Sequence, residues 1–247
     1  VQLADFSTLE SNAFAFALAR DNIRLLRIIN SALRSIPANQ QLDILRRWSA
    51  GNLGVLGTER LRLSTSEQRW LEKHPRVRVV ASDQMLPLAS FTAQGQSEGL
   101  SADVLSRISL RTGLKFDVVP GGSMPQQIEA VRSGWADMMA VVTPSLEGSD
   151  QVRFTRPYLT NPLVLVTRTD TPGTMTLENM LGKRLVIPSG NALRDVINRD
   201  YPGIQFVEAK NPTDAMALVA NGSAEGAVSS LIYARYLIAF EYRDRLH

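Results

Sequence analysis

The sequence contains no cysteine and only two histidines, His74 and His247, in 247 residues. Disulfides and thiolate metal sites are therefore excluded, and His-dependent triads or metal clusters have almost no material. The absence of cysteine is compatible with an oxidising compartment without proving one. We predict no metal site and no cofactor.

Long apolar runs and runs of like charge are also missing. No apolar run approaches the roughly 18 residues that a membrane-spanning helix needs. No signal-peptide pattern follows Val1, and we expect the chain to be a piece of a longer protein. The 27 Lys and Arg residues are interspersed with 24 Asp and Glu residues, whereas a phosphate-binding surface clusters its basic residues. Nucleic-acid binding is therefore not expected.

The composition that is present, 44% hydrophobic and 21% charged residues, is that of a soluble globular protein with a sizeable core. Residues 12–48 begin with NAFAFALA, in which Phe14, Phe16 and Leu18 alternate with alanines in the period of a strand. Two helices follow, with Pro37 between them. The first helix is predicted to bury Ile23, Leu26, Ile29, Leu33 and Ile36, and the second carries Leu42, Leu45 and Trp48.

A glycine-rich connector, residues 51–63, precedes a third helix. Ser64 and Glu67 form a capping-box pattern that opens this helix, which must end before Pro75. His74 is interpreted as a helix-end residue. A domain boundary is predicted near residue 64.

From residue 77 onward, predicted strands and helices alternate. The strands are VRVVA, KFDVVP, WADMMAVV, PLVLVTR, RLVIPSG, IQFVEA and AEGAVSS, and the helices include residues 101–113, MPQQIEAVRSG, NALRDVINRD and NPTDAMALVANG, the last with Asn211 as N-cap. This order favours mostly parallel sheets covered by helices on both faces. The order restarts after a polar linker that follows Arg168, so we predict two α/β lobes with a cleft between them.

Six segments in this order carry a family resemblance over about residues 76–240. They are RVRVVASDQMLPLASF, GLSADVLSRISLRTGLKF, MPQQIEAVRSGWADMMAVVTPS, VRFTRPYLTNPLVLVTR, LENMLGKRLVIPSGNALRDVI and NPTDAMALVANGSAEGAVSSLIYARYLI. Together they resemble the type II periplasmic solute-binding proteins of the polar amino-acid family. The resemblance implies the two-lobed Venus-flytrap fold, an α/β fold with two hinge crossings near Tyr158, Asn161 and Pro162.

The front of the chain narrows the resemblance. Residues 14–48 resemble the closing segment of a flytrap domain, and LSTSEQRWLEKHPRVRVV resembles the opening of the next one in a tandem array. Such a join is similar to the periplasmic region of BvgS- and EvgS-type hybrid sensor kinases, in particular its second flytrap domain. We expect residues 1–50 to be a closing segment, 51–75 a connector and linker helix, 76–160 lobe 1, 161–230 lobe 2 and 231–247 a return towards lobe 1.

The sequence alone does not decide to which domain residues 12–48 belong. Residues 12–48 are either a remnant of a preceding domain, or they fill a missing place on lobe 1, within one chain or swapped with another. We favour filling, because uncovered large apolar side chains would leave an aggregation-prone strand edge. Exposure of Phe14 and Phe16 would contradict this hypothesis.

The expected ligand site departs from the family pattern. Relatives place an arginine after a Thr-Pro pair to bind an α-carboxylate, whereas here Leu146 follows Thr143, Pro144 and Ser145. Relatives place an aspartate for the α-ammonium where this chain has Ser230, and Met85 replaces a stacking aromatic. Because the loss of two charge-assisted bonds removes roughly 1.5 to 3 kcal/mol each, binding of an ordinary amino acid is not expected.

What remains suits an anion. Ser189, Gly190, Asn191 and Ala192 form a loop before a helix, whose N–H groups and positive end would face the cleft. Thr143, Ser101, Ser229 and Ser230 add hydroxyls, and Tyr233 could reach the cleft mouth or pack in the core. The alternative for the loop residues and the hydroxyl residues is that they only cap helices and strand ends. The resemblance allows a small organic anion, such as a nicotinate-like carboxylate.

The resemblance implies a periplasmic sensor domain of a bacterial inner-membrane receptor that relays lobe opening or closure to a cytoplasmic kinase. Its partners would be a neighbouring flytrap domain and a second subunit of a homodimer. An enzyme is not expected, because the cleft carboxylate candidates Asp83, Asp103 and Glu147 form no diagnostic pair. The alternative is a solute-binding protein of an ABC transporter for a polar small molecule.

Overall fold

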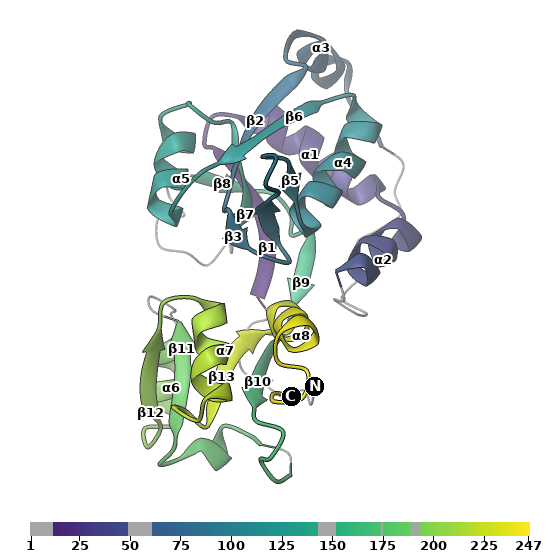
Figure 1. Ribbon diagram of the computed structural model, residues 1–247. Coiled ribbons are helices and arrows are strands. Elements are labelled where there is room, and N and C mark those ends of the chain that lie inside the picture. The colour runs from purple at the N-terminus through teal and green to yellow at the C-terminus, as the bar shows by residue number, and fades with distance from the viewer. Residues whose placement is uncertain (1–11, 49–60, 143–151, 174, 189–192) are drawn as a thin grey trace. The chain divides into compact units, whose positions relative to one another are not determined.

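The computed structural model describes residues 12–48, 61–142, 152–173, 175–188 and 193–247. Two compact units are formed, each around its own sheet (Figure 1). The first unit extends from Ala13 to Thr160, and the second unit contains Asn161–His247. The chain thus passes from the first unit to the second between two of the predicted hinge residues, Tyr158 and Asn161.

The main sheet of the first unit has the strand order β6-β2-β7-β1-β8, and β9 also pairs with β1. Its strands are β1 (Asn12–Ala19), β2 (Arg76–Ala81), β6 (Lys115–Pro120), β7 (Met138–Val142), β8 (Val152–Phe154) and β9 (Leu159–Asn161). β2 pairs in parallel with β6 and β7, whereas β1 is antiparallel to β7 and β8. The strand predicted from NAFAFALA is therefore confirmed, and it lies inside the sheet.

The two faces of β1 bury residues of different size. Phe14 and Phe16 are 4% and 0% exposed, and the Phe16 ring lies 4.6 Å from that of Tyr158. Ala17, on the opposite face, packs with Val131 and Met139. The exposure that would have contradicted packing of this segment on lobe 1 is not observed. The place of residues 1–50 in the longer protein stays a prediction.

Two helices follow β1, namely α1 (Ile23–Ser35) and α2 (Ala38–Arg47). The predicted face of α1 is partly wrong. Ile29 and Leu33 are buried as expected, but Ile23 is 43% exposed and the buried stripe includes Leu25 and Ile28. Apolar residues spaced three and four apart are compatible with more than one buried face of the helix. The packing of α1 against α4 determines which face is buried.

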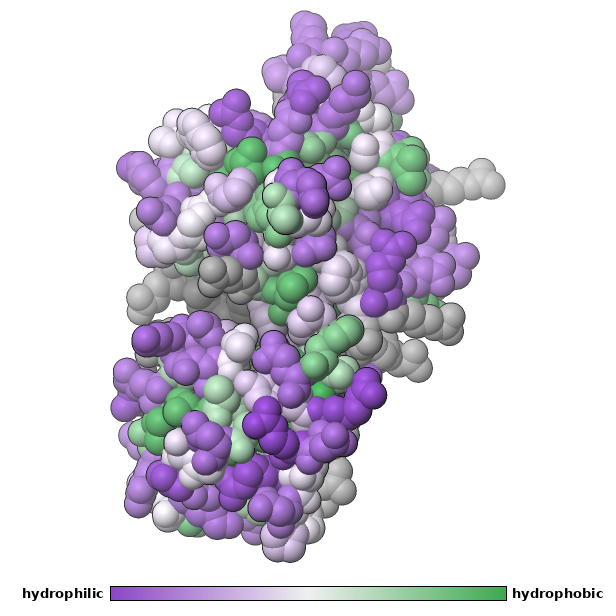
Figure 2. Space-filling model, in the orientation of Figure 1, coloured by the Kyte–Doolittle hydropathy of each residue, from purple (hydrophilic) through white to green (hydrophobic). Residues whose placement is uncertain are grey.

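Helix α3 (Thr65–Lys73) carries the predicted capping box. The Ser64 hydroxyl accepts a bond from the Glu67 backbone N–H, and the Ser64 N–H donates to the Glu67 carboxylate. His74 is the C-cap, as interpreted, and its ring stacks on Trp70. No residue of α3 is buried, and hydrophilic side chains dominate the region of α3 in Figure 2.

The remaining elements of the first unit are two helices and a small sheet. α4 (Leu100–Thr112) ends at Gly113, which has a φ of +77°, and α5 (Met124–Arg132) begins with a capping box of Ser123 and Gln126. Figure 1 shows α5 on one side of the main sheet and α1 and α4 on the other. The short strands β3 (Gln84–Met85), β4 (Ala89–Phe91) and β5 (Ser97–Glu98) form a separate antiparallel sheet that was not predicted.

The second unit contains a sheet in the order β10-β13-β11-β12. Its elements are β10 (Leu163–Thr167), η1 (Glu178–Met180), β11 (Arg184–Pro188), α6 (Leu193–Asp200), β12 (Gln205–Ala209), α7 (Pro212–Ala220), β13 (Gly226–Ser230) and α8 (Leu231–Phe240). Asn211 caps α7 as predicted, since its side-chain oxygen accepts a bond from the Asp214 N–H. One face of the sheet packs with Ile197 of α6 and Met180, and α7 and α8 contact the sheet as well.

The C-terminal segment differs from the expectation that residues 231–247 return towards lobe 1. Helix α8 packs on β10 and β13 within the second unit. His247 exchanges two backbone hydrogen bonds with Thr167, at 2.9 and 3.0 Å, and so extends the end of β10. The physical reason is that the apolar side chains of α8, including Ile232 and Leu237, are buried on this sheet.

The two sheets share one plan. β2-α4-β6-α5-β7 and β11-α6-β12-α7-β13 each place their first strand between the second and third in parallel. In each unit an earlier strand, β1 or β10, then pairs antiparallel with the third strand. Such parallel units with covering helices are typical of α/β proteins. No helix in the described ranges combines the length and apolarity needed to cross a membrane.

Candidate functional site

Half of the predicted ligand residues lie outside the described residues. These are Thr143, Ser189, Gly190 and Asn191, and the same applies to Leu146, Glu147 and Ala192. Of the other four, Met85 and Ser101 belong to the first unit, and Ser230 and Tyr233 belong to the second. Their surroundings are described below, one unit at a time.

In the first unit, the hydroxyl of Ser101 has a partner within the fold. Ser101 is 3% exposed, and its Oγ donates to the carbonyl oxygen of Leu88 at 2.8 Å. Gly99, which has a φ of +111°, lies so close to this segment that a Cβ would meet the Leu88 oxygen at 2.7 Å. Ser101 therefore ties the start of α4 to the small sheet, in which Met85 is half-buried.

The carboxylate of Asp103 also has a structural role. It accepts hydrogen bonds of 2.8 Å from the Arg47 guanidinium and from the Trp48 indole N–H. These bonds join the end of α2 to the first turn of α4. Asp103 was considered as a cleft carboxylate, and its contacts connect two helices instead.

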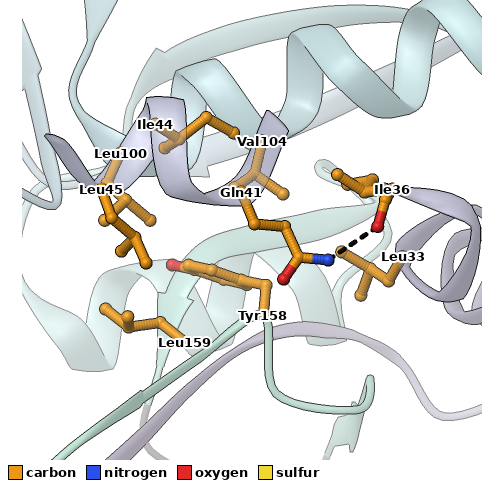
Figure 3. A pocket seen from close by; sticks show the side chains of 9 residues that line it. All are labelled: Leu33, Ile36, Gln41, Ile44, Leu45, Leu100, Val104, Tyr158 and Leu159. Carbon is orange, nitrogen blue, oxygen red and sulfur yellow. Dashed lines mark hydrogen bonds between the residues drawn. The ribbon is translucent and has the colours of Figure 1, made fainter. Parts of the chain in front are cut away.

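The predicted hinge residue Tyr158 packs inside the first unit. It is 6% exposed, and its hydroxyl donates to the Ala140 carbonyl at 3.1 Å. Figure 3 shows its ring in a pocket between α1, α2 and α4, with Gln41 reaching to the Ile36 carbonyl at 2.7 Å. The other residues that line this pocket are Leu33, Ile44, Leu45, Leu100, Val104 and Leu159.

This pocket is too small for an organic ligand. Its free volume is about 20 Å³, which is room for one water molecule. Its walls are mostly aliphatic, so it offers few groups that would orient a polar ligand. We interpret it as the packing seam between α2 and the rest of the first unit.

In the second unit, Tyr233 is a core residue. It is 8% exposed, and burial raises the pKa of its phenol well above the ordinary value. Of the two readings left open by the sequence, core packing therefore agrees with the structure. The hydroxyl of the nearby Ser229 lies 3.4 Å from the Ser230 carbonyl oxygen, a distance at which a hydrogen bond is weak.

Ser230, Asn161 and Pro162 meet where β13 passes into α8. The Leu231 N–H donates to the Pro162 carbonyl at 2.9 Å, and the Ile232 N–H donates to Asn161 Oδ1 at 3.1 Å. Ser230 is the N-cap of α8, but its side chain makes no capping bond. The predicted hinge residues Asn161 and Pro162 thus satisfy the first free N–H groups of this helix.

Two polar atoms at this junction have no hydrogen-bond partner among the described residues. Asn161 is 0% exposed and Ser230 is 7% exposed. Asn161 Nδ2, which can only donate, and Ser230 Oγ are both buried and form no hydrogen bond in the part of the chain that the structure describes. Buried polar groups are hydrogen-bonded in the large majority of cases. The two unpaired atoms therefore distinguish Asn161 and Ser230 from the other described site residues.

Comparison with known proteins identifies the class. Residues 77–224 match the bacterial extracellular solute-binding proteins, family 3, over more than half of the chain. The chain belongs to this family. Its fold is the two-lobed, type II periplasmic-binding-protein (Venus flytrap) fold that its solved neighbours share, among them an ancestral arginine-binding protein with a TM-score of 0.57 at 20% identity, covering 70% of this chain and 77% of that one.

The more similar relatives are sensor proteins. The chain is 34% identical over 232 residues to the virulence sensor protein BvgS of Bordetella bronchiseptica, which covers 94% of this chain and 19% of that protein. It is 23% identical over 234 residues to the sensor protein EvgS of Escherichia coli K12, with coverages of 94% and 19%. The chain thus spans about a fifth of the length of these curated relatives.

Solved structures agree with this assignment. The periplasmic second flytrap domain of Bordetella pertussis BvgS has a TM-score of 0.66 at 32% identity, covering 75% of this chain and 79% of that one. The structure of the whole BvgS periplasmic domain has a TM-score of 0.62 at 31% identity, covering 92% and 44%. The chain is homologous to periplasmic sensor domains of hybrid kinases. It corresponds to the solute-binding-protein-like part of such a receptor and not to its catalytic kinase part.

Sequence reasoning missed the roles of Asp103 and Asn161. Asp103 lies in the first turn of an amphipathic helix, where a carboxylate is favourable without any partner. Asn161 precedes a proline and was assigned to the hinge on family grounds alone. A signal for it exists in the order Asn-Pro before a buried strand, which indicates a side chain that satisfies nearby backbone groups.

Proposed function

We propose that this chain is the ligand-responsive periplasmic sensor domain of a membrane-anchored hybrid histidine kinase, and that it binds a small organic anion. The observation that supports the sensing role is the 34% identity to BvgS over 94% of the chain. The bound anion would shift the balance between open and closed arrangements of the flytrap by its differential affinity for the two. A kinase outside this chain would respond to that shift.

The chemistry of the ligand is supported by what the described site residues offer. Ser230 stands where amino-acid-binding relatives are expected to carry an aspartate, so a ligand ammonium has no carboxylate there. Ser230 and Asn161 instead present an O–H and an N–H group beside the N-terminal end of α8. Donors and a positive helix end favour a carboxylate over a cation. The proposed ligand residues remain Thr143, Ser189, Gly190, Asn191 and Ser230.

The proposed partners are a neighbouring flytrap domain and a second receptor subunit, as in the expected tandem homodimer. A transporter-associated solute-binding protein has less support, because the more similar curated relatives are sensor proteins. The distinction is testable in a receptor that contains this domain.

The binding part of the proposal is tested by calorimetry and thermal unfolding of the chain with nicotinate, benzoate and succinate, each compared with its neutral amide. A bound acid at 100 times its Kd should stabilise the folded state by about 2.7 kcal/mol, and the amide should not. Thr143→Ala and Asn191→Ala should weaken that effect. Stabilisation by no acid would favour a structural role for this domain.

The signalling part needs the full-length receptor in membrane vesicles. Autophosphorylation of the kinase should change when the acid that binds the isolated domain is added on the periplasmic side. Thr143→Ala should shift the response to higher acid concentration by the same factor as it weakens binding. Binding without any change in autophosphorylation would contradict the sensing role and leave the ligand class intact.

A further inference from the structure

In the described chain, the beginning of α8 is where buried polar side-chain atoms lack a hydrogen-bond partner. Asn161 Nδ2 comes from β9 and Ser230 Oγ from the end of β13, and both are buried without a hydrogen-bond partner in the described ranges. Two strands that are distant in sequence therefore bring two polar atoms without a partner in the described ranges to one helix end. Elsewhere in the fold, comparable groups such as Ser31 Oγ and Ser101 Oγ have partners.

The orientation of the Asn161 amide follows from its neighbour. The Ile232 backbone N–H can only donate, so the Asn161 atom that it contacts at 3.1 Å must be the oxygen. The other amide atom, Nδ2, can only donate as well. It therefore requires an acceptor, and another donor or a cation could not satisfy it.

Ser230 adds a second donor at the same place. As N-cap of α8 it makes no side-chain bond to the helix, so within the described ranges its O–H has no acceptor. α8 has 10 residues and no acidic residue in its first turn. The positive end of the helix is therefore not neutralised from within the helix.

We infer that Asn161 Nδ2 and Ser230 Oγ form a donor pair for one carboxylate oxygen of the anion that this domain binds. The inference rests on the proposed function and adds Asn161 as a ligand-contacting residue. Both atoms are closed to solvent in this conformation, so an anion reaches them only after the residues that cover them move. Binding at this pair is thereby coupled to a change of conformation.

The test uses Ser230→Ala with Ser31→Ala as its matched control. Both serines are 7% exposed, but the Ser31 hydroxyl donates to the Arg62 carbonyl at 2.9 Å. Without ligand, Ser230→Ala should leave the unfolding temperature unchanged or raise it, because it removes an unsatisfied polar group, whereas Ser31→Ala should lower it. With nicotinate, benzoate or succinate, Ser230→Ala should lose about tenfold or more in affinity, the worth of a charge-assisted bond, and Ser31→Ala none.

A second pair of variants tests the amide. Asn161→Asp keeps the acceptor for the Ile232 N–H, removes the donor and adds a charge of the same sign as the ligand. Asn211→Asp adds the same charge at the exposed N-cap of α7 and keeps its capping oxygen. Asn161→Asp should lose more affinity for the acids than Ser230→Ala, whereas Asn211→Asp should bind as the unaltered chain does. If Asn161→Asp does not fold, the result with Ser230→Ala decides.

Three results would overturn the inference. Unchanged acid affinity in Ser230→Ala would do so while leaving the proposed function intact. A loss of ligand-free stability in Ser230→Ala as large as that in Ser31→Ala would show that the hydroxyl has a partner within the domain, such as an internal water. Failure of the unaltered chain to bind any of the acids would overturn the proposed ligand class as well, so the two failures are distinguishable.

Discussion

In both units the same type of turn precedes the third parallel strand, β7 or β13, but the arginine beside the turn has a different partner in each. In the first unit the turn is Gly134-Trp-Ala-Asp137 before β7, and in the second it is Gly222-Ser-Ala-Glu225 before β13. Both glycines have a positive φ, +76° and +81°. In both, the acidic side chain accepts a 2.8 Å bond from a backbone N–H of the central strand, at Arg78 or Arg184.

The arginine side chains make the difference. The Arg184 guanidinium binds the Glu225 carboxylate and holds the pKa of Glu225 at about 2. The Arg78 guanidinium instead donates to the Trp135 carbonyl and lies 5.2 Å from the centre of the Trp135 ring. In both turns the acidic side chain thus binds a backbone N–H of the neighbouring strand. The arginine side chain differs: it contacts Trp135 in the first unit and Glu225 in the second.

A second difference concerns the antiparallel strand. β10 and β11 are joined without an intervening α-helix, whereas α1, α2 and α3 separate β1 from β2. In the first unit, the antiparallel strand β1 is therefore distant in sequence from the strands with which it pairs. Four predictions test these contrasts, from the largest expected effect to the smallest.

The largest effect is expected at β1. Phe16→Ala should lower the free energy of unfolding by about 3 to 5 kcal/mol, because it leaves a cavity beside Tyr158 in a fully buried site. Leu165→Ala in β10 should cost about 2 to 5 kcal/mol by the same mechanism. Urea unfolding measures both. A cost below about 1 kcal/mol for Phe16→Ala would show that β1 is not an integral strand of the first unit.

The next effect concerns the attachment of α2. Asp103→Ala removes the partner of Arg47 and Trp48 and should cost about 1.5 kcal/mol, since Arg47 is largely exposed and its contribution is screened. Asp83→Ala, at an exposed carboxylate, should stay within about 0.5 kcal/mol. Unfolding followed by tryptophan fluorescence distinguishes the two. Equal costs would mean that α2 is held by its apolar contacts alone.

The ion pair of the second unit predicts a pH dependence. The folded-state pKa of Glu225 is lowered from 4.5 to about 2, so its contribution is complete above pH 4.5 and is lost as pH falls from about 4.5 towards 2. Because Glu225 is 30% exposed, that contribution is at most about 1 kcal/mol. Glu225→Gln should flatten the fall of the unfolding temperature in this pH range, and added salt should reduce the difference. A profile identical to that of the unaltered chain would contradict the pairing.

The smallest effect is expected at Trp135. Trp135 is 52% exposed, and its interaction with Arg78 should be worth about 0.5 kcal/mol. Trp135→Ala is compared with Ser223→Ala, the equivalent position of the other turn, which should be neutral. Chemical denaturation at low ionic strength gives both values. A cost above about 2 kcal/mol would indicate that the Trp135 ring has a packing role that its exposure does not suggest.

Local signals in the sequence were sufficient for most of the elements. The capping box at Ser64, the N-cap at Asn211 and the strand period of residues 12–19 are each confirmed, because each depends on residues a few positions apart. The family and the flytrap fold followed from the order of the segments. The repeated Gly-x-Ala-acid turn is also a local pattern of the sequence.

Contacts between distant segments were not predictable in the same way. The hydroxyl of Ser101 could face a ligand or a carbonyl, and only the fold shows that Leu88 lies within 2.8 Å. Residues 231–247 carry an apolar helix that could cover either lobe, and the pairing of His247 with Thr167 selects the second. The four predicted ligand residues outside the described ranges stay predictions.

The interior position of β1 also has a consequence for how the chain is made. Ala15 pairs with Val142 and Ala17 with Phe154, so β1 leaves the ribosome long before the strands on either side of it. Until β7 and β8 have been synthesised, Phe14 and Phe16 cannot be buried in the sheet. An unpaired apolar strand readily associates with another chain. β1 must therefore wait for β7 and β8 before it can pair in the sheet, and pairing over such a sequence separation is slow. Assembly of this domain therefore includes an interval in which β1 needs protection from other chains.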